Sequence, residues 1–318
     1  MSVAGKHLLS ITDLSRDEVQ SIFESAARLK QMQARRAAHP ALAGRTLAMI
    51  FEKPSLRTRA TFEIGMYQLG GHVVHFQPHE IRLGERETIA DVAHNLERWV
   101  DLIMCRVFLH RTARTLAENS RAPVINGLCD REHPCQALTD LFTIHERKGS
   151  LAGRVLAFVG DGNNVAHSLM LLCAKLGMEF RIACPSGYEP DPLITDEATQ
   201  IAAATSAEVR ILDDPVAAAT GADVLYTDVW VSMGQEAETQ ERLRAFQRYQ
   251  LNGGLLRHAR PDAVVMHCLP AHRGEEITDE VIDGSQSVVF DQAENRLHVQ
   301  KAIMVTLLGV PCPSLGGG

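Results

Sequence analysis

The stretch Phe51-Glu52-Lys53-Pro54-Ser55-Leu56-Arg57-Thr58-Arg59 places two hydroxyls and two guanidiniums at the start of one predicted helix. Residues 47–51 are predicted to form a buried strand, and Pro54 prevents the strand from continuing. A helix N-terminus favours an anion, and arginine offers a planar fork that matches phosphate oxygens. The alternative is that Ser55 is only a helix cap and that the arginines are solvated surface residues.

Polar residues also follow several other predicted strands. Arg106 ends one strand, His133-Pro134-Cys135-Gln136 opens a helix after another, and two more strands precede Asp228-Val-Trp-Val-Ser232-Met233-Gly234 and His267-Cys268-Leu269-Pro270. Ligands bind at the carboxyl ends of strands in open parallel sheets, so these turns are candidates for one site. Taken singly, His133 could be a helix cap, Asp228 a turn residue and Cys268 a packed thiol.

The loop Gly160-Asp-Gly-Asn-Asn164 follows a predicted strand and opens a helix, as a dinucleotide-binding loop does. The match is incomplete because Val165 stands in place of the third glycine. The next strand ends in Ala183-Cys184-Pro185, which offers no acidic residue to a ribose. We therefore expect no nicotinamide cofactor. The phosphate-binding motif of P-loop nucleotidases does not occur in the chain.

A metal site is a second alternative for the residues near the end of the chain. His267, Cys268 and His272 carry the right donor atoms, but their spacing matches no zinc pattern. Histidine and cysteine at a strand end are often packed or hydrogen-bonded instead. We expect no metal here.

The elements that must position these turns form two blocks of alternating strands and helices. A capping box at Ser15 to Glu18 opens the first helix, and the glycine-bearing turn at residues 149–153 is the most plausible boundary. Such alternation is typical of a parallel sheet covered on both faces. We expect an α/β protein of two doubly wound domains, residues 1–149 and 150–318, with the active site between them. The expected strands are 47–51, 72–76, 101–107, 123–126, 155–159, 179–183, 209–212, 223–227, 263–267 and 288–290. The last helix, from about residue 293 to 308, could pack back on the first domain.

Composition narrows the function classes. The 318 residues with 45% apolar content can fill two cores, and the net charge of −7 argues against nucleic acid as a partner. We expect no membrane span, because the apolar runs are too short. Seven scattered cysteines without a C-x-x-C pair suit reduced thiols, and with no apolar signal segment we expect a cytoplasmic protein.

Together, four motifs resemble the aspartate/ornithine carbamoyltransferase family over nearly the whole chain. They are Ser55-Leu-Arg-Thr-Arg59, His133-Pro-Cys-Gln136, Asp228-x-x-x-Ser-Met-Gly234 and His267-Cys-Leu-Pro270, in the family's order. The last two resemble the ornithine enzymes more than the aspartate enzymes. The resemblance implies transfer of a carbamoyl group from carbamoyl phosphate to the δ-amine of ornithine, with no cofactor and no metal, by a homotrimer with shared active sites.

The residues suit this chemistry independently of the resemblance. Carbamoyl phosphate carries a dianionic phosphate and a carbonyl that gains charge when an amine attacks, so its site must hold one anion and stabilise a second. The resemblance gives catalytic roles to Arg106, His133 and Cys268. It implies carbamoyl phosphate contacts from Ser55, Leu56, Arg57, Thr58, Arg82, Arg106, His133, Gln136, Cys268, Leu269 and Arg296.

In the second domain, Asp228 can pair with an α-ammonium, and Asn164, the Ser232 hydroxyl and the Met233 N–H can receive an α-carboxylate. An aspartate substrate would bring a second carboxylate near Asp228, so ornithine fits better. The ornithine δ-amine must lose a proton before it attacks, and the family places Cys268 nearby. The resemblance also implies that the Leu269 carbonyl orients a substrate and that the Leu269-Pro270 bond is cis.

Two positions depart from the family pattern. Leu56 stands where the ornithine enzymes usually have a threonine. The backbone N–H of Leu56 can still bind phosphate. Arg82 stands where relatives often have Gln or His reaching into a neighbouring subunit's phosphate site. The alternatives to ornithine are aspartate, putrescine and acylated ornithine as amines, a non-catalytic carbamoyl phosphate-binding protein, and a NAD-dependent dehydrogenase.

Overall fold

The computed structural model describes residues 3–231 and 236–313. The chain forms two compact units, Met1–Thr139 with Glu294–Gly318, and Asp140–Ala293. Two helices, α6 (Pro134–Lys148) and α13 (Val289–Leu307), each contribute residues to both units. The expected boundary at residues 149–153 follows α6, whereas the compact units divide inside it. None of the helices in the described ranges is both long and apolar enough to cross a membrane.

The first unit is built on a parallel sheet of order β2-β1-β3-β4. Its strands are β1 (Thr46–Phe51), β2 (His72–Phe76), β3 (Leu102–Arg106) and β4 (Val124–Leu128). Its helices, besides parts of α6 and α13, are α1 (Arg16–Ala34), α2 (Leu56–Gln68), α3 (Pro78–Ile81), α4 (Ile89–Leu96) and α5 (His110–Glu118), with a short 3-10 helix at Ile11–Asp13.

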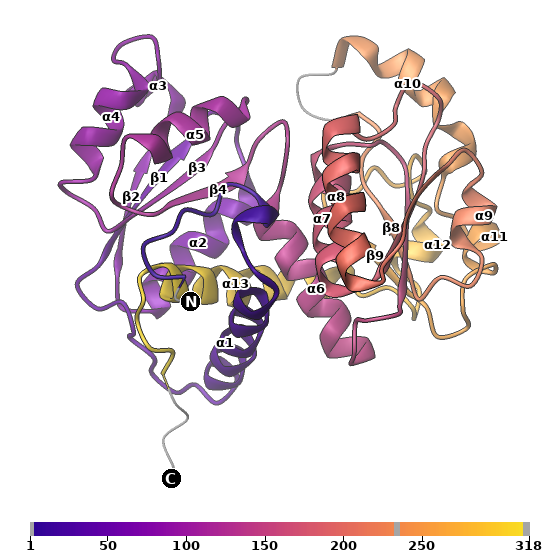
Figure 1. The fold of residues 1–318 in the computed structure, drawn as a ribbon, viewed down its shortest axis with the longest axis horizontal. Coiled ribbons are helices and arrows are strands. Elements are labelled where there is room, and N and C mark those ends of the chain that lie inside the picture. Colours follow the sequence, from indigo (N-terminus) through magenta and orange to yellow (C-terminus); the bar gives the residue numbers. More distant parts are fainter. Residues whose placement is uncertain (1–2, 232–235, 314–318) are drawn as a thin grey trace. The chain divides into compact units, whose positions relative to one another are not determined.

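Helices cover both faces of this sheet (Figure 1). On one face, apolar residues of α4 and α5, such as Val92 and Leu116, pack on Ile50 and Ile103 of the strands. On the other face, α2 and the C-terminal half of α13 lie against each other around Gly65. Both faces are therefore buried, which explains why β1 and β3 are almost uniformly apolar.

The second unit contains a parallel sheet of order β7-β6-β5-β8-β9. Its strands are β5 (Val155–Val159), β6 (Glu179–Ala183), β7 (Val209–Leu212), β8 (Val224–Thr227) and β9 (Val264–His267). Helices α7 (Asn164–Leu176) and α8 (Pro192–Thr205) cover one face. The other face carries α9 (Pro215–Ala219), α11 (Gly253–Leu256) and α12 (Asp279–Ile282). Between β8 and α11, the chain forms α10 (Thr239–Ala245) and 3-10 turns at Glu236–Glu238 and Gln247–Tyr249.

The expectation of two parallel α/β sheets is confirmed, and one expected strand is wrong. Val289 and Phe290 form the first turn of α13 instead of a strand. The apolar run there makes only a single bridge, between Ser287 and Val265, before the chain turns into the helix. An apolar run this short carries no periodicity that separates a strand from the buried start of a helix.

Candidate active site

The turn after β1 caps α2 and presents its N-terminus. The Ser55 hydroxyl accepts the Thr58 N–H at 3.2 Å, so Ser55 is the N-cap. Arg57 is half-buried, whereas Arg59 is exposed and pairs with Glu63 one turn along the helix, with 3.5 Å between Nε and Oε2. Of the two guanidiniums expected near an anion, Arg57 is therefore the candidate, and Arg59 belongs to the helix surface.

Two further arginines meet at Thr58. In the parallel pairing of β1 with β3, Phe51 lies opposite Arg106, which brings Arg106 to the same sheet edge as the Ser55 turn. Its guanidinium donates to the Thr58 hydroxyl at 3.3 Å. Arg296 of α13 donates to the same hydroxyl at 3.1 Å and also to the amide oxygen of Gln136. The first unit thus gathers cations where its sheet order reverses, the usual place for a ligand in such sheets.

His133 is buried among these arginines. Burial, together with the positive charges of Arg296, Arg106 and Arg57, lowers the pKa of His133 well below the ordinary value. The imidazole is therefore neutral near pH 7. Its one ring N–H can donate a hydrogen bond, but the ring cannot act as a general acid. A neutral donor beside fixed cations suits an oxygen that acquires negative charge during a reaction.

In the second unit, the loop after β5 meets the end of β8. Asn163 caps α7 by accepting the N–H groups of Val165 and Ala166 at 2.9 and 3.1 Å, and it donates to Asp228 at 2.9 Å. Asn164 is the first residue of α7. Gly162 is packed against the chain at residues 189–190, since an added Cβ would lie 2.2 Å from the Pro190 nitrogen. This glycine therefore serves a close contact between two parts of the chain.

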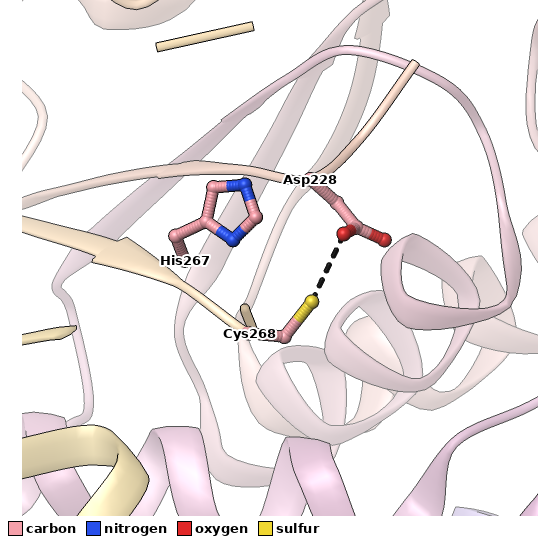
Figure 2. Close-up of side chains that lie close together, drawn as sticks. All are labelled: Asp228, His267 and Cys268. Carbon is pink, nitrogen blue, oxygen red and sulfur yellow. Dashed lines mark hydrogen bonds between the residues drawn. The ribbon is translucent and has the colours of Figure 1, made fainter. Parts of the chain in front are cut away.

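Asp228 and Cys268 lie side by side because of strand pairing. Thr227 of β8 pairs with His267 of β9, so the next residue of each strand projects from the same edge. Figure 2 shows the result: the Cys268 thiol donates to an Asp228 oxygen at 2.9 Å. Asp228 is buried and Cys268 is half-buried. The seven cysteines, all of which lie in the described residues, are thiols and not disulfides.

Asp228, His267 and Cys268 also have the composition of a metal site, since one ligand atom from each lies within 4.8 Å of the others. The ring of His267 does not fit that role. Its Nδ1 accepts the Leu269 N–H at 2.8 Å, and its Nε2 bonds the Glu276 carboxylate at 3.0 Å. Both nitrogens are therefore engaged, and a metal could bind only by breaking one of these bonds.

These bonds give His267 a structural task. A backbone N–H only donates, so Nδ1 must be unprotonated and Nε2 must carry the proton. Leu269 has a φ of 58°, a strained value for a side chain of this size, and its peptide bond to Pro270 is cis, as the resemblance implies. His267 thus holds the Cys268-Leu269 turn in place, and Glu276 holds His267.

We predict that two substitutions of His267 separate these two bonds. In His267→Asn, the amide oxygen can replace Nδ1 and still accept the Leu269 N–H. In His267→Gln, the amide reaches Glu276 but not Leu269. We expect kcat/KM of the enzyme to fall by no more than about tenfold in the first variant and by about 100-fold in the second. Equal losses in the two variants, measured by steady-state kinetics, would show that the Leu269 bond is not what matters.

One expected site residue, Arg82, is not brought together with the others. Arg82 is exposed in the loop between α3 and α4, with a φ of 41°. Ser232 and Met233 lie outside the described residues. Asn163, Glu276 and Gln292 were not predicted as site residues, although Asn163 belongs to the loop at residues 160–164. Gln292 accepts the His267 N–H at 3.0 Å and donates to Asp140 and Tyr226, a network that spacing along the chain does not reveal.

Both parts of the chain match models of one protein family. Residues 6–146 match the family model described as aspartate/ornithine carbamoyltransferase, carbamoyl-P binding domain, and residues 152–307 match the Asp/Orn binding domain. The chain is 52% identical to the ornithine carbamoyltransferase of Thermococcus kodakarensis over 97% of this chain and 98% of the relative. It has the same identity to the Pyrococcus furiosus enzyme named anabolic ornithine carbamoyltransferase, with the same coverage.

A solved structure points the same way. The ornithine carbamoyltransferase from Pyrococcus furiosus superposes with a TM-score of 0.95 at 51% identity, covering 97% of this chain and 99% of that chain. The chain therefore belongs to the aspartate/ornithine carbamoyltransferase family.

Proposed function

We propose that this chain transfers the carbamoyl group of carbamoyl phosphate to the δ-amine of L-ornithine, giving L-citrulline and phosphate. The observation that carries the proposal is the neutral His133 among Arg57, Arg106 and Arg296, next to the capped N-terminus of α2. This arrangement can hold a dianion and also stabilise a second, developing negative charge. Neither a dehydrogenase nor a metal-dependent hydrolase needs one site that binds a dianion and also stabilises a second negative charge with a neutral histidine and arginines.

The first unit's residues divide into two roles. Ser55, the Leu56 N–H, Arg57 and Thr58 bind the phosphate, because a helix N-terminus and a guanidinium both favour it. Arg106, His133 and Gln136 face the carbamoyl group. When the amine attacks, the carbonyl oxygen becomes an oxyanion, and donors fixed in advance stabilise it more than they stabilise the ground state. The C–O bond to phosphate then breaks, and the phosphate leaves with the bonding electron pair.

The second unit's residues receive the amino acid. The α-ammonium pairs with Asp228, while the N-terminus of α7 at Asn164 receives the α-carboxylate together with Ser232 and Met233. The δ-ammonium must lose a proton to attack. The Cys268 thiol donates to Asp228, which holds the sulfur in place beside the position where the δ-amine is to lose its proton. The Leu269 carbonyl orients the reacting groups.

A direct test compares four amines with carbamoyl phosphate: ornithine, aspartate, putrescine and acetylornithine. Putrescine keeps an ammonium that could pair with Asp228 but lacks the carboxylate, so the groups proposed to receive the α-carboxylate would be left unpaired. We expect kcat/KM for ornithine to exceed that for putrescine on the order of 10⁴-fold. Release of product from another amine at a rate matching ornithine, measured by a colorimetric ureido assay, would reject the assignment.

We also propose that the chain acts as a homotrimer in which Arg82 enters the phosphate site of a neighbouring subunit. Arg82 is exposed in its own subunit, on the loop between α3 and α4, and so is available to another chain. An arginine there can add a charge-assisted bond to phosphate. We also propose that the reaction runs in the direction of citrulline synthesis, because the Pyrococcus furiosus relative is named anabolic.

A further inference from the structure

Lys301, on α13, is fully buried and has a complete set of neutral acceptors. Its ammonium donates to the amide oxygens of Gln33 and Gln68 at 3.0 and 2.8 Å and contacts His39 Nε2 at 3.2 Å. His39 Nδ1 lies 2.9 Å from the Ala37 carbonyl, which only accepts. His39 therefore carries its proton on Nδ1, and its Nε2 accepts from Lys301. The three ammonium protons each have a partner.

The surroundings stabilise the positive charge of Lys301, although none of its three hydrogen-bond partners is a carboxylate. Gln33 belongs to the last turn of α1, and Gln68 is the last residue of α2. Helix dipoles make the carboxyl ends of helices favourable for positive charge. Lys301 thus joins α13 to the ends of two other helices.

The contacts of Lys301 can affect the phosphate site because both ends of α2 contact α13. At the N-terminus, Thr58 accepts from Arg296 of α13. At the C-terminus, Gln68 accepts from Lys301. Between them, Gly65 lies so close that an added Cβ would be 3.0 Å from Lys301 Cγ. A shift of α2 along α13 would therefore change the spacing between Thr58 and Arg296.

We propose that Lys301 is a positioning residue for carbamoyl phosphate: by holding Gln68, it fixes α2 on α13 and keeps the phosphate turn at its distance from Arg296. The inference rests on the proposed role of Ser55, Arg57 and Thr58 in phosphate binding. It adds a residue that touches neither substrate and lies at the opposite end of α2 from the turn.

The same geometry makes phosphate binding sensitive to mildly alkaline pH. Burial lowers the pKa of Lys301 to about 8, and above it the neutral amine has two N–H groups for three acceptors. The other titratable groups that interact with it are His39 after α1, His298 on α13 and Cys312 after α13, while Lys30 of α1 acts on His298. Burial lowers the pKa of both histidines and raises that of Cys312, so these three stay neutral near pH 8. Lys30 bonds Asn295 at 2.8 Å, and α2 contributes the uncharged Gln68.

Three variants test the proposal by calorimetric binding of carbamoyl phosphate. Lys301→Met removes the ammonium, Gln68→Leu removes the acceptor on α2, and Gln33→Leu is the matched control on α1. We expect Kd for carbamoyl phosphate to rise about tenfold in the first two and to stay unchanged in the control. Between pH 7 and 9, wild-type affinity should fall more than that of Lys301→Met, which has no ammonium to lose.

The Gln33 and Gln68 variants remain informative if Lys301→Met does not fold, because each leaves the lysine in place. Equal changes of Kd in Gln33→Leu and Gln68→Leu, or no change in Gln68→Leu, would overturn the proposal and leave Lys301 a stability residue. An unchanged Kd in Lys301→Met would overturn it as well. Wild-type protein that binds carbamoyl phosphate without forming citrulline would instead contradict the proposed reaction, so the two failures are distinguishable.

Discussion

Replacing Arg57 by alanine should reduce kcat/KM for citrulline formation by roughly 10² to 10³-fold without unfolding the protein. The substitution removes the guanidinium from the capped N-terminus of α2, and Arg57 is one of the three cations whose charge lowers the pKa of His133. Its loss should therefore weaken both the phosphate contact and the electrostatic field at the carbamoyl group. Saturation kinetics with carbamoyl phosphate measures the effect.

The chain supplies a matched control two residues away. Arg59 lies in the same helical turn, but it is exposed and pairs with Glu63 on the surface. An exposed pair of this kind contributes about 0.3–0.5 kcal/mol. Arg59→Ala should therefore keep nearly full activity. Thermal unfolding should place both variants within about 1 kcal/mol of wild type. If Arg57→Ala lost its folded state, or if Arg59→Ala were as inactive, Arg57 would have no specific role in phosphate binding.

The turns that carry the site were predictable because each combines a buried strand with a helix start. Ser55 is one example, since a proline, a hydroxyl and a helical apolar repeat in sequence indicate an N-cap. Asp228 and Cys268 are another, because residues at the ends of neighbouring parallel strands meet at one edge of the sheet. The strand order needed to make them neighbours came from the structure.

Contacts between distant residues were not predictable in this way. Lys301 and Gln68 are 233 positions apart, and nothing in their local sequence indicates that they bond. Glu276 lies only nine positions from His267, yet its role depends on a turn whose shape is set by Leu269. The misassigned strand at 288–290 has a related cause, because a buried helix start and a buried strand have the same apolar composition.

Arg82 provides the other large effect, because we propose that it serves a neighbour's site and not its own. An Arg82→Ala subunit then lacks only what it lends to its neighbour. An Arg57→Ala subunit spoils its own phosphate site but still lends an intact Arg82. Homogeneous preparations of either variant should be nearly inactive, since every site lacks one of the two arginines.

Mixed trimers should recover activity. When equal amounts of the two variants are dissociated and reassembled at random in a closed ring, a site has an intact Arg57 with a probability of one half. It receives an intact Arg82 from its neighbour with the same probability, so about a quarter of the sites should be complete. The mixture should approach that fraction of wild-type activity. Differently tagged subunits, resolved by native mass spectrometry, would establish that exchange has occurred. A fully exchanged mixture with only the average activity of its two parents would mean that Arg82 is not donated between subunits.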